Sequence, residues 1–578
     1  MMDRRTLLAF MLIALILILT RPFYEMIGLA PPPRQPTASP EEPPFDRHLP
    51  EQTGEAGLLP ETPPESHQPV IQPASSFPEK QVYVETPLYL AAVSSRGGGM
   101  LTSFKLKNYL THDGKPVDLI SSRPTPDNLL IAFTHVSGDT VTLVHPFELI
   151  LDASASDTLR LTDRELTLTY RTDLPAGTIT KTLLFHPGSY VIDVSVDLTQ
   201  ISRPQISQER FLLTWDQGLP ITEENQVDDV REFAAFLYQG GERIKKKHKK
   251  DELESVSAPG RTSWTSIRSK YFTAAFIPRD ESLFGHVLAH PYDAGHRNPP
   301  PSPQYEMAVG FSSKYPITCS LYLGPLKYSR IKRLNVDLEK TMSFGFALIR
   351  PISKGVLLLL TALHKVVPNY GVLLIIFSVV VKIIVYPLTR KSYQSTKEMQ
   401  AIQPLIAELR EKYKGDPQRL NRATMNLYKE HGVNPLGGCL PMLLQMPLLI
   451  ALFVVFRTTI ELRAAPFVWW IDDLSAPDAL IRLGGRLPIL GWDQISLLPL
   501  LMGVSMFVQQ RMMGTQVTGQ QKFTSYFMTG FFILIFNQFP SGLNLYYTLF
   551  NVLTILQQKY LTHPPQPAPV PSPSKKKR

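Results

Sequence analysis

Cysteine is scarce in this sequence, and its scarcity excludes several kinds of site. The chain has 578 residues and only two cysteines, Cys319 and Cys439. Cys319 lies in a polar region and Cys439 at the start of an apolar run, so we expect no disulfide between them. The CxxC spacing that is typical of metal and redox sites is absent as well.

The motifs of common enzyme classes are also missing. The sequence contains no P-loop, no GxSxG, no HExxH and no convincing pair of carboxylates. We therefore predict no catalytic residues, no metal site and no cofactor, and a function other than catalysis.

Long apolar runs are confined to the N-terminal segment and the last third of the chain. The net charge is +9, but the basic residues cluster at particular ends of these runs. This pattern is typical of a membrane protein with anionic partners, and we expect no specific nucleic-acid sequence as a ligand.

The N-terminal 80 residues divide into an anchor and a linker. Residues 1–29 predict a signal-anchor transmembrane helix, with Arg4 and Arg5 in the cytoplasm. A cleaved signal peptide is the alternative, but its small-residue site runs directly into Pro31. Residues 30–80 are dense in Pro, Glu, Ser and Gln and predict a disordered periplasmic linker.

Residues 81–338 predict an all-β sandwich of the supersandwich kind. Short alternating strands, such as those at 166–170 and 190–196, recur between turn residues. A basic run at 243–250 lies inside this domain, and we interpret it as a solvated loop.

The rest of the chain predicts an α-helical membrane core. Residues 339–367 predict an amphipathic helix at the membrane surface. Within the core, 368–560, five spans are expected, near 371–389, 436–457, 496–511, 524–540 and 542–558. With the anchor, the fold class is a multi-domain membrane protein with six transmembrane helices and a periplasmic β domain.

Charge asymmetry predicts the orientation of these spans. Nine Lys and Arg residues lie in the loop 390–430, against three in the loop 461–493. The loop 390–433 and the basic tail 561–578 are therefore expected in the cytoplasm, and the β domain in the periplasm. We predict a helical hairpin at 390–433, with helices at 395–413 and 417–430. Its turn is formed by Gly415, Asp416 and Pro417.

Lys382 is the sharpest feature of the predicted spans. A charge in mid-span costs several kcal/mol unless water or a partner receives it, which makes it a candidate functional residue. Other polar residues of the spans join it in a predicted hydrated groove: Ser378, Gln445, Asn544, Tyr547, Thr548 and Asn551. The alternatives are a lysine that snorkels to the cytoplasmic surface and ordinary polar contacts between helices.

Several segments make a resemblance specific. They are Tyr386-Pro387-Leu388-Thr389, Asn434-Pro435-Leu436-Gly437-Gly438-Cys439, Gln445-Met446-Pro447, Glu461-Leu462-Arg463, Ala465-Pro466-Phe467, Trp470-Ile471, Asp473-Leu474-Ser475 and Phe539-Pro540-Ser541-Gly542-Leu543. In this order the sequence resembles the YidC/Oxa/Alb family of membrane protein insertases, as found in Gram-negative bacteria. The resemblance covers 340–560 and extends more weakly into the β domain.

The resemblance implies a function and its partners. A hydrophilic groove would attract the polar part of a nascent membrane protein, whose apolar segment then slides into the lipid of the inner membrane. The hairpin and the basic tail would contact the ribosome and the targeting receptor. The chain would insert its substrates alone or beside the Sec translocon and its accessory subunits. The family usually has arginine at the groove position, whereas this sequence has Lys382.

Three other functions compete with this interpretation. A multi-span transporter or channel with a periplasmic binding domain is the main alternative, but no internal repeat or set of paired intramembrane charges supports it. An enzyme lacks motifs, since a sandwich fold alone does not imply activity. A purely structural assembly factor would not need the polar residues of the spans.

Overall fold

The computed structural model describes residues 77–120, 127–135, 140–150, 157–175, 177–201, 206–293, 301–433, 440–483, 494–512 and 519–561. These form two compact units. The β unit comprises the chain up to Pro325 together with Leu334–Thr341. The helical unit comprises Leu326–Arg333 and the chain from Met342 onward. The predicted N-terminal anchor, nearly all of the linker, Cys439 and the basic tail lie outside the described residues.

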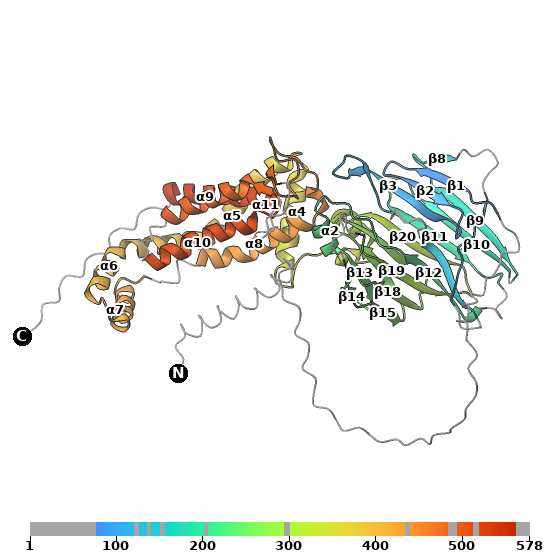
Figure 1. Cartoon of the computed structure of the whole chain (residues 1–578), viewed down its shortest axis with the longest axis horizontal. Coiled ribbons are helices and arrows are strands. Elements are labelled where there is room, and N and C mark those ends of the chain that lie inside the picture. Colours follow the sequence, from blue (N-terminus) through green and yellow to red (C-terminus); the bar gives the residue numbers. More distant parts are fainter. Residues whose placement is uncertain are drawn as a thin grey trace, which may run out of the picture. The chain divides into compact units, whose positions relative to one another are not determined.

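Three antiparallel-rich sheets build the β unit (Figure 1). The five-stranded sheet has the order β4 (Pro116–Asp118), β3 (Met100–Leu110), β2 (Tyr89–Ser94), β1 (Gln81–Glu85), β8 (Thr158–Arg160). The nine-stranded sheet has the order β14 (Glu242–Lys246), β13 (Ala234–Gln239), β16 (Thr262–Arg268), β17 (Phe272–Pro278), β20 (Ile317–Pro325), β11 (Val191–Asp197), β10 (Gly177–Phe185), β9 (Leu166–Leu174), β7 (Glu148–Ile150). The six-stranded sheet has the order β15 (Glu254–Pro259), β18 (Phe284–Ala289), β19 (Tyr305–Ser312), β12 (Ile206–Asp216), β5 (Asn128–His135), β6 (Thr140–Thr142).

Alternating side chains explain why these strands stack into a sandwich. In β10, every second residue from Ile179 to Phe185 is buried, which is the period of a strand with one face in the core. The nine-stranded and six-stranded sheets pack against each other, and Trp215 of β12 meets Phe276 of β17 edge-on at 6.4 Å. The predicted β-sandwich is confirmed.

The basic run 243–250 was predicted to be a loop, and this prediction is wrong for 243–246, whereas 247–250 lie outside the strands. Its first half forms the edge strand β14, which pairs with β13. Lys246 and Lys249 form ion pairs with Glu254 on the neighbouring β15. The charges suit an edge strand because they discourage pairing with other chains.

Short helical turns connect the two units along the chain: α3 (Tyr328–Ile331), Lys332–Leu334 and Leu338–Thr341. A further short helix, α2 (Gln226–Glu232), belongs to the β unit. In the helical unit, α4 (Arg350–His364) buries Val356, Leu357 and Leu360 and packs against the helices that follow it.

The helical unit continues with α5 (Tyr370–Ala401), α6 (Gln403–Lys412), α7 (Pro417–Glu430), α8 (Leu440–Thr458), α9 (Leu497–Met512), α10 (Gly519–Phe536) and α11 (Ser541–Leu556). A small hairpin of β21 (Ala479–Arg482) and β22 (Gln494–Ser496) precedes α9. The prediction of a single helix at 395–413 is wrong. Helix α5 instead runs on through Pro387 to Ala401, and α6 begins after a break at Ile402.

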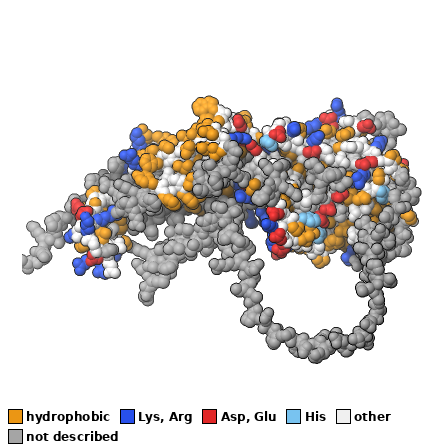
Figure 2. Space-filling view, in the orientation of Figure 1, with side chains coloured by type: hydrophobic (Ala, Val, Ile, Leu, Met, Phe, Trp, Pro, Cys, Tyr) orange, Lys and Arg blue, Asp and Glu red, His pale blue; other side chains and the backbone are white. Residues whose placement is uncertain are grey.

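Among the described residues, one helical segment, Tyr370–Pro387, is long and apolar enough to cross a membrane, and Gln445–Thr458 is a shorter apolar helix. Figure 2 shows hydrophobic side chains over much of the visible face of α5, α9 and α10, while Lys and Arg gather over α6 and α7.

Candidate functional site: a polar cluster in the helical unit

Helix α5 places Lys382 on its inward face. Asn369 caps the helix, because its side-chain oxygen accepts a hydrogen bond from the backbone N–H of Val372 at 3.1 Å. One stripe at helical spacing is buried: Leu374, Phe377, Ser378, Val381 and Lys382. The opposite stripe exposes large apolar side chains: Val372, Ile375, Ile376, Val379 and Ile383. The charge of Lys382 therefore faces the bundle rather than its apolar exterior.

Two groups of α11 receive the ammonium of Lys382, which is only 9% exposed. Its Nζ donates a hydrogen bond to Oγ1 of Thr554 at 2.6 Å and lies 4.3 Å from the ring centroid of Phe550. The Thr554 hydroxyl in turn donates to the carbonyl oxygen of Phe550 at 2.7 Å, so its lone pairs point to the lysine. The hydroxyl and the ring face both suit a cation.

A second polar contact lies one helical turn from the first. Nδ2 of Asn551 donates to Oγ of Ser505 on α9 at 3.0 Å, and both residues are buried. Because Asn551 and Thr554 are three residues apart, they lie side by side on α11. We call Lys382, Ser505, Asn551 and Thr554 the polar cluster.

The other predicted site residues lie elsewhere. Ser378 and Thr548 donate to carbonyl oxygens of their own helices, at Leu374 and Asn544. Asn544 donates to the carbonyl oxygens of Phe536 and Phe539 at the turn between α10 and α11. Gln445 is half-buried in α8.

Tyr547 belongs to an aromatic layer. Phe377 of α5 contacts Tyr546 at 5.8 Å, and Tyr546 contacts Phe550 at the same centroid distance. Phe536 contacts Tyr547 at 5.9 Å and Phe539 at 4.8 Å. We define the aromatic layer as Phe377, Phe453, Phe536, Phe539, Tyr546, Tyr547 and Phe550, since Phe453 also meets Phe539.

Sequence reasoning missed Thr554 and Ser505. Thr554 continues the stripe of Asn544, Tyr547 and Asn551 by three residues, so extending the same helical period would have found it. Ser505 is a lone serine between apolar residues of α9, and nothing in its local pattern distinguishes it from a serine that bonds to its own helix.

The turn of the predicted hairpin lies between α6 and α7. Gly415 adopts a left-handed conformation, with φ of +99°. Oδ1 of Asp416 accepts a hydrogen bond from the backbone N–H of Arg419 at 3.0 Å, and Pro417 occupies the first helical turn of α7. Each residue type thus suits its position in a helix–turn–helix connection.

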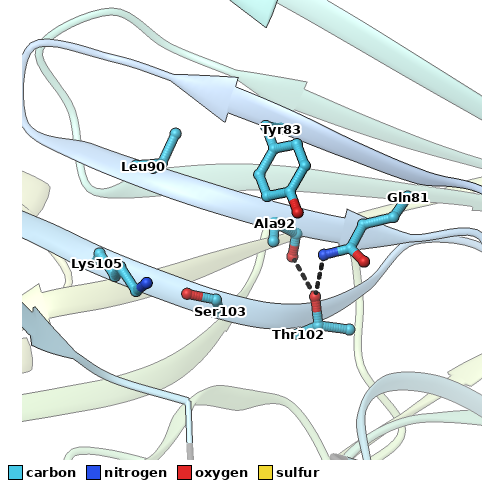
Figure 3. A pocket seen from close by; sticks show the side chains of 7 residues that line it. All are labelled: Gln81, Tyr83, Leu90, Ala92, Thr102, Ser103 and Lys105. Atoms are coloured by element: carbon cyan, nitrogen blue, oxygen red, sulfur yellow. Dashed lines mark hydrogen bonds between the residues drawn. The ribbon is translucent and has the colours of Figure 1, made fainter. Parts of the chain in front are cut away.

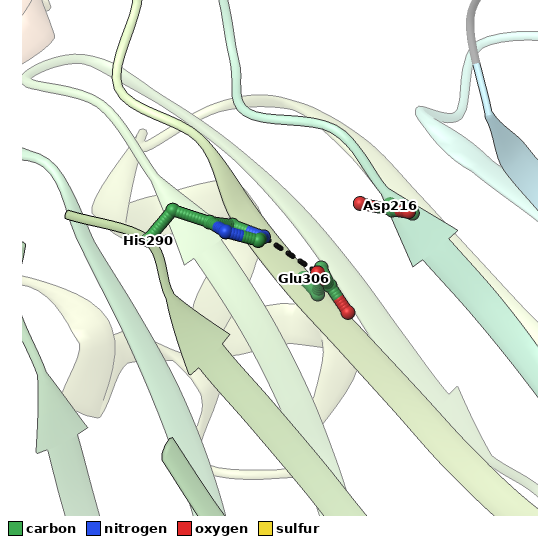
Figure 4. Close-up of side chains that lie close together, drawn as sticks. All are labelled: Asp216, His290 and Glu306. Atoms are coloured by element: carbon green, nitrogen blue, oxygen red, sulfur yellow. Dashed lines mark hydrogen bonds and ion pairs between the residues drawn. The ribbon is translucent and has the colours of Figure 1, made fainter. Parts of the chain in front are cut away.

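Two features of the β unit resemble binding sites. Asp216, His290 and Glu306 offer ligand atoms within 4.8 Å of one another (Figure 4). Nε2 of His290 pairs with Oε1 of Glu306 at 2.5 Å, and all three side chains are partly or largely exposed. Such a group is an ordinary surface ion pair beside a further carboxylate.

The second feature is a hollow of about 280 Å³ on β1, β2 and β3 (Figure 3). Gln81 and Thr102 hydrogen-bond across it at 3.2 Å, and Lys105 is the one ionisable side chain among the lining residues other than Tyr83. The hollow lies on the solvent-facing side of the strands and has no convergent set of reactive groups.

Comparisons with known proteins match the two units to two family models. Residues 81–355 match the YidC periplasmic domain, and residues 362–567 match the 60Kd inner membrane protein family. Among solved structures, an active YidC insertase with its first transmembrane domain resolved is 17% identical, covers 85% of this chain and 94% of that chain, and gives a TM-score of 0.37.

Curated relatives that match most of the chain are named membrane protein insertase YidC. The membrane protein insertase YidC of Chlorobium luteolum is 38% identical, over 87% of this chain and 86% of the relative. That of Chlorobaculum parvum is 36% identical, over 97% of this chain and 94% of the relative. The chain therefore belongs to the YidC family of membrane protein insertases.

Proposed function

We propose that this chain inserts newly made integral membrane proteins into the bacterial inner membrane and helps them to fold. The helical unit is the insertion core, and the polar cluster is the inner end of a hydrophilic groove. The observation that carries this proposal is Lys382, a cation on the inward face of α5 that contacts a hydroxyl and a ring on α11. In this proposal the chain catalyses no reaction. It transfers polar groups of the substrate from water into the membrane.

The exposed apolar stripes support a lipid surround for this core. On α9, Leu500, Leu501, Val504, Phe507 and Val508 are exposed at helical spacing. Such a surface is unfavourable in water and suits contact with acyl chains. With the N-terminal anchor, we propose six spans, with both chain termini and the α6–α7 hairpin in the cytoplasm and the β unit in the periplasm.

The electrostatic role of Lys382 follows from its surroundings. A carboxylate at close range gains roughly 1 kcal/mol from a unit charge in bulk water and several-fold more at the effective dielectric of a protein. The buried position of Lys382 therefore strengthens its attraction for an acidic substrate tail. This attraction offsets part of the cost of bringing that tail into the membrane.

The proposed partners are those that such a function requires. Nascent membrane proteins are the substrates, and the basic side chains of α6 and α7 suit contact with the ribosome or the targeting receptor. The Sec translocon and its accessory subunits, together with membrane lipids, complete the expected set.

The test is an insertion assay with one model substrate whose tail carries zero, one or two acidic residues. We expect Lys382→Arg to retain insertion, since charge matters more than shape for a mobile tail. Lys382→Ala should slow the two-acid tail most and the neutral tail least. Lys382→Glu should be worse than alanine for acidic tails, because repulsion replaces attraction.

Lys354→Ala is the matched control. Lys354 lies on α4, and its Nζ is 5.7 Å from the ring centroid of Phe344, so it too is a lysine beside a ring. It should leave the dependence on tail charge unchanged. If Lys382→Ala inserts all three tails as well as the parent, Lys382 is a structural lysine and the electrostatic role is wrong.

The proposed orientation has its own test. Single cysteines at Lys414, in the α6–α7 turn, and at the exposed Asp472, after α8, should react with an impermeant reagent from opposite sides. The background carries Cys319→Ala and Cys439→Ala. Labelling of Lys414→Cys and Asp472→Cys from the same side would contradict the proposed topology.

A further inference from the structure

A loop at one end of the helical unit contacts several helices. We call residues 463–478 the cap loop. Its Phe467 packs against Gly371 at the start of α5, so closely that a Cβ atom on Gly371 would lie 1.9 Å from the Phe467 ring. Along the chain, the short helical turn Ile460–Leu462 separates the cap loop from α8, and the cap loop precedes the hairpin that leads into α9.

Carbonyl groups of the cap loop bind the N-terminus of α11. The backbone N–H of Ser541 donates to the carbonyl of Ala476 at 2.7 Å, and that of Gly542 donates to the carbonyl of Leu474 at 3.0 Å. Oγ of Ser541 donates to the carbonyl of Asp473 at 2.8 Å. The N–H groups at a helix start lack partners within the helix, and here the loop supplies them.

Asp478 binds the cap loop to α9. Its Oδ2 accepts hydrogen bonds from the backbone N–H groups of Leu497 at 2.9 Å and Leu498 at 2.7 Å. The same oxygen accepts one from Nε1 of Trp470 at 3.2 Å. Asp478 is 2% exposed, and burial raises the pKa of its carboxyl while these donors lower it. Oδ2 of Asp478 therefore joins the Trp470 ring of the cap loop to the first turn of α9.

The polar cluster lies far from this end along α11. Thr554 follows Ser541 by 13 residues, or about 20 Å along a helix. Between them lie Tyr546, Tyr547 and Phe550 of the aromatic layer. Along α11 the order is thus cap loop, aromatic rings and polar residues, and helix α5 has the same order from Gly371 through Phe377 to Lys382.

We propose that Asp478 is a positioning residue that holds the cap loop shut, so that the polar cluster is reached only from the end that carries α6 and α7. Trp470 is its partner in this role. The proposal rests on the proposed insertion function, because a one-ended groove lets a substrate tail enter from the cytoplasm without opening a path for water and ions across the membrane.

Two substitutions separate closure from simple stability. Asp478→Ala removes both the tie to Trp470 and the acceptor for α9. Trp470→Phe removes the tie alone and leaves the acceptor of Leu497 and Leu498 in place. Asp472→Ala is the matched control, since Asp472 is an exposed carboxylate of the same loop.

The experiment measures the labelling rate of Ser505→Cys, in the polar cluster, in the full-length protein without its native cysteines. A small charged methanethiosulfonate is applied to right-side-out and to inverted membrane vesicles. We expect Asp478→Ala to raise the rate from the outer side at least tenfold and Trp470→Phe to raise it by less. The rate from the hairpin side, and both rates in Asp472→Ala, should match the parent.

An unchanged outer rate in both Asp478→Ala and Trp470→Phe would overturn the proposal. Equal increases from both sides would do so too, because they indicate general loosening. If Asp478→Ala fails to accumulate, Asp478→Leu replaces it, because leucine fills the site but has no hydrogen-bond acceptor. The labelling rate does not depend on a substrate. If the chain fails to insert substrates but Ser505→Cys is still labelled from the hairpin side alone, the insertion function is refuted and the closure role stands.

Discussion

Two buried cations of the β unit have carboxylate partners, and they can be compared with Lys382 of the helical unit. In the β unit, Arg268 pairs with Glu232 at 2.6 Å and Lys270 with Asp228 at 2.9 Å, whereas the buried Lys181 donates to backbone carbonyls. In the helical unit, Lys382 contacts a hydroxyl and an aromatic ring. The ion pairs of Arg268 and Lys270 suit a structural role in the β unit, whereas Lys382 is the cation for which we propose a functional role.

The two units also reverse the placement of apolar side chains. The β unit buries its large rings, among them Trp215, Trp264 and Tyr305, as a soluble domain does. Helices α5, α9 and α10 expose Ile383, Val504 and Phe527. A unit that buries its apolar side chains depends on internal packing for stability, whereas one that exposes them depends on its solvent.

The largest expected effect concerns an ion pair of the β unit. Arg268→Ala leaves the half-buried Glu232 without the Arg268 guanidinium and removes the donor to the carbonyl of Thr341. We expect a loss of about 3–5 kcal/mol in the unfolding free energy of the β unit, measured by urea unfolding of the full chain in detergent. Arg261→Ala, at an exposed site, should change it by about 0.5 kcal/mol at most.

Insertion of a neutral-tailed substrate should survive Arg268→Ala if the helical unit is the insertion core. Complete loss of insertion by a stably accumulated Arg268→Ala protein would remove the functional distinction between the two units.

A second prediction concerns Lys181, which lacks a carboxylate partner among its described contacts. It donates hydrogen bonds to the carbonyls of Gly97 and Leu129, and burial lowers its pKa to about 7. The unfolded lysine keeps its proton up to roughly pH 10. Between these values the unfolded chain binds more protons, so stability should rise with pH, by about 1.4 kcal/mol per unit.

The measurement is urea unfolding between pH 7.5 and 9.5, followed by tryptophan fluorescence. Lys181→Met removes the titrating group, so its stability should depend less steeply on pH than that of the parent. Equal slopes in the two proteins would show that Lys181 stays protonated in the folded β unit.

The smallest effect compares two glycines of neighbouring helices. A Cβ atom on Gly503 of α9 would lie 2.4 Å from Cδ1 of Ile533 on α10, whereas one on Gly530 would meet nothing within 4 Å. Gly503→Ala should therefore cost about 1–3 kcal/mol through overpacking, and Gly530→Ala should be neutral. Thermal unfolding of the detergent-solubilised chain tests this, and similar melting temperatures for the two variants would contradict close α9–α10 packing.

Much of the fold could be predicted from the sequence, because its signals are local. Alternation in 166–170 and 190–196 located strands β9 and β11. The break of α5 at Ile402 was missed, although Pro404 in the first turn of α6 marks it, because a proline within a helical pattern favours a helix boundary just before it. Strand β14 was missed because lysines are rare in strands, and only its pairing with β13 explains it.

The candidate site was predictable only in part. Lys382 stands out because a lysine is rare within an apolar span. Its partner Thr554 depends on how α5 and α11 pack, which no local pattern determines. Asn544 and Asn551 occupy the same stripe of α11, yet one bonds near the α10–α11 turn and the other bonds to Ser505. The position of each along the bundle, rather than its residue type, decides its contacts.

A charge-swap cycle tests the central claim that Lys382 attracts the substrate's tail. Lys382→Glu and a substrate whose single tail carboxylate is changed to lysine are assayed for insertion separately and together. The account predicts that the combined change restores much of the insertion that Lys382→Glu loses with the acidic tail, so that the two effects are not additive. Additive effects, with no rescue by the basic tail, would show that position 382 and the tail do not interact.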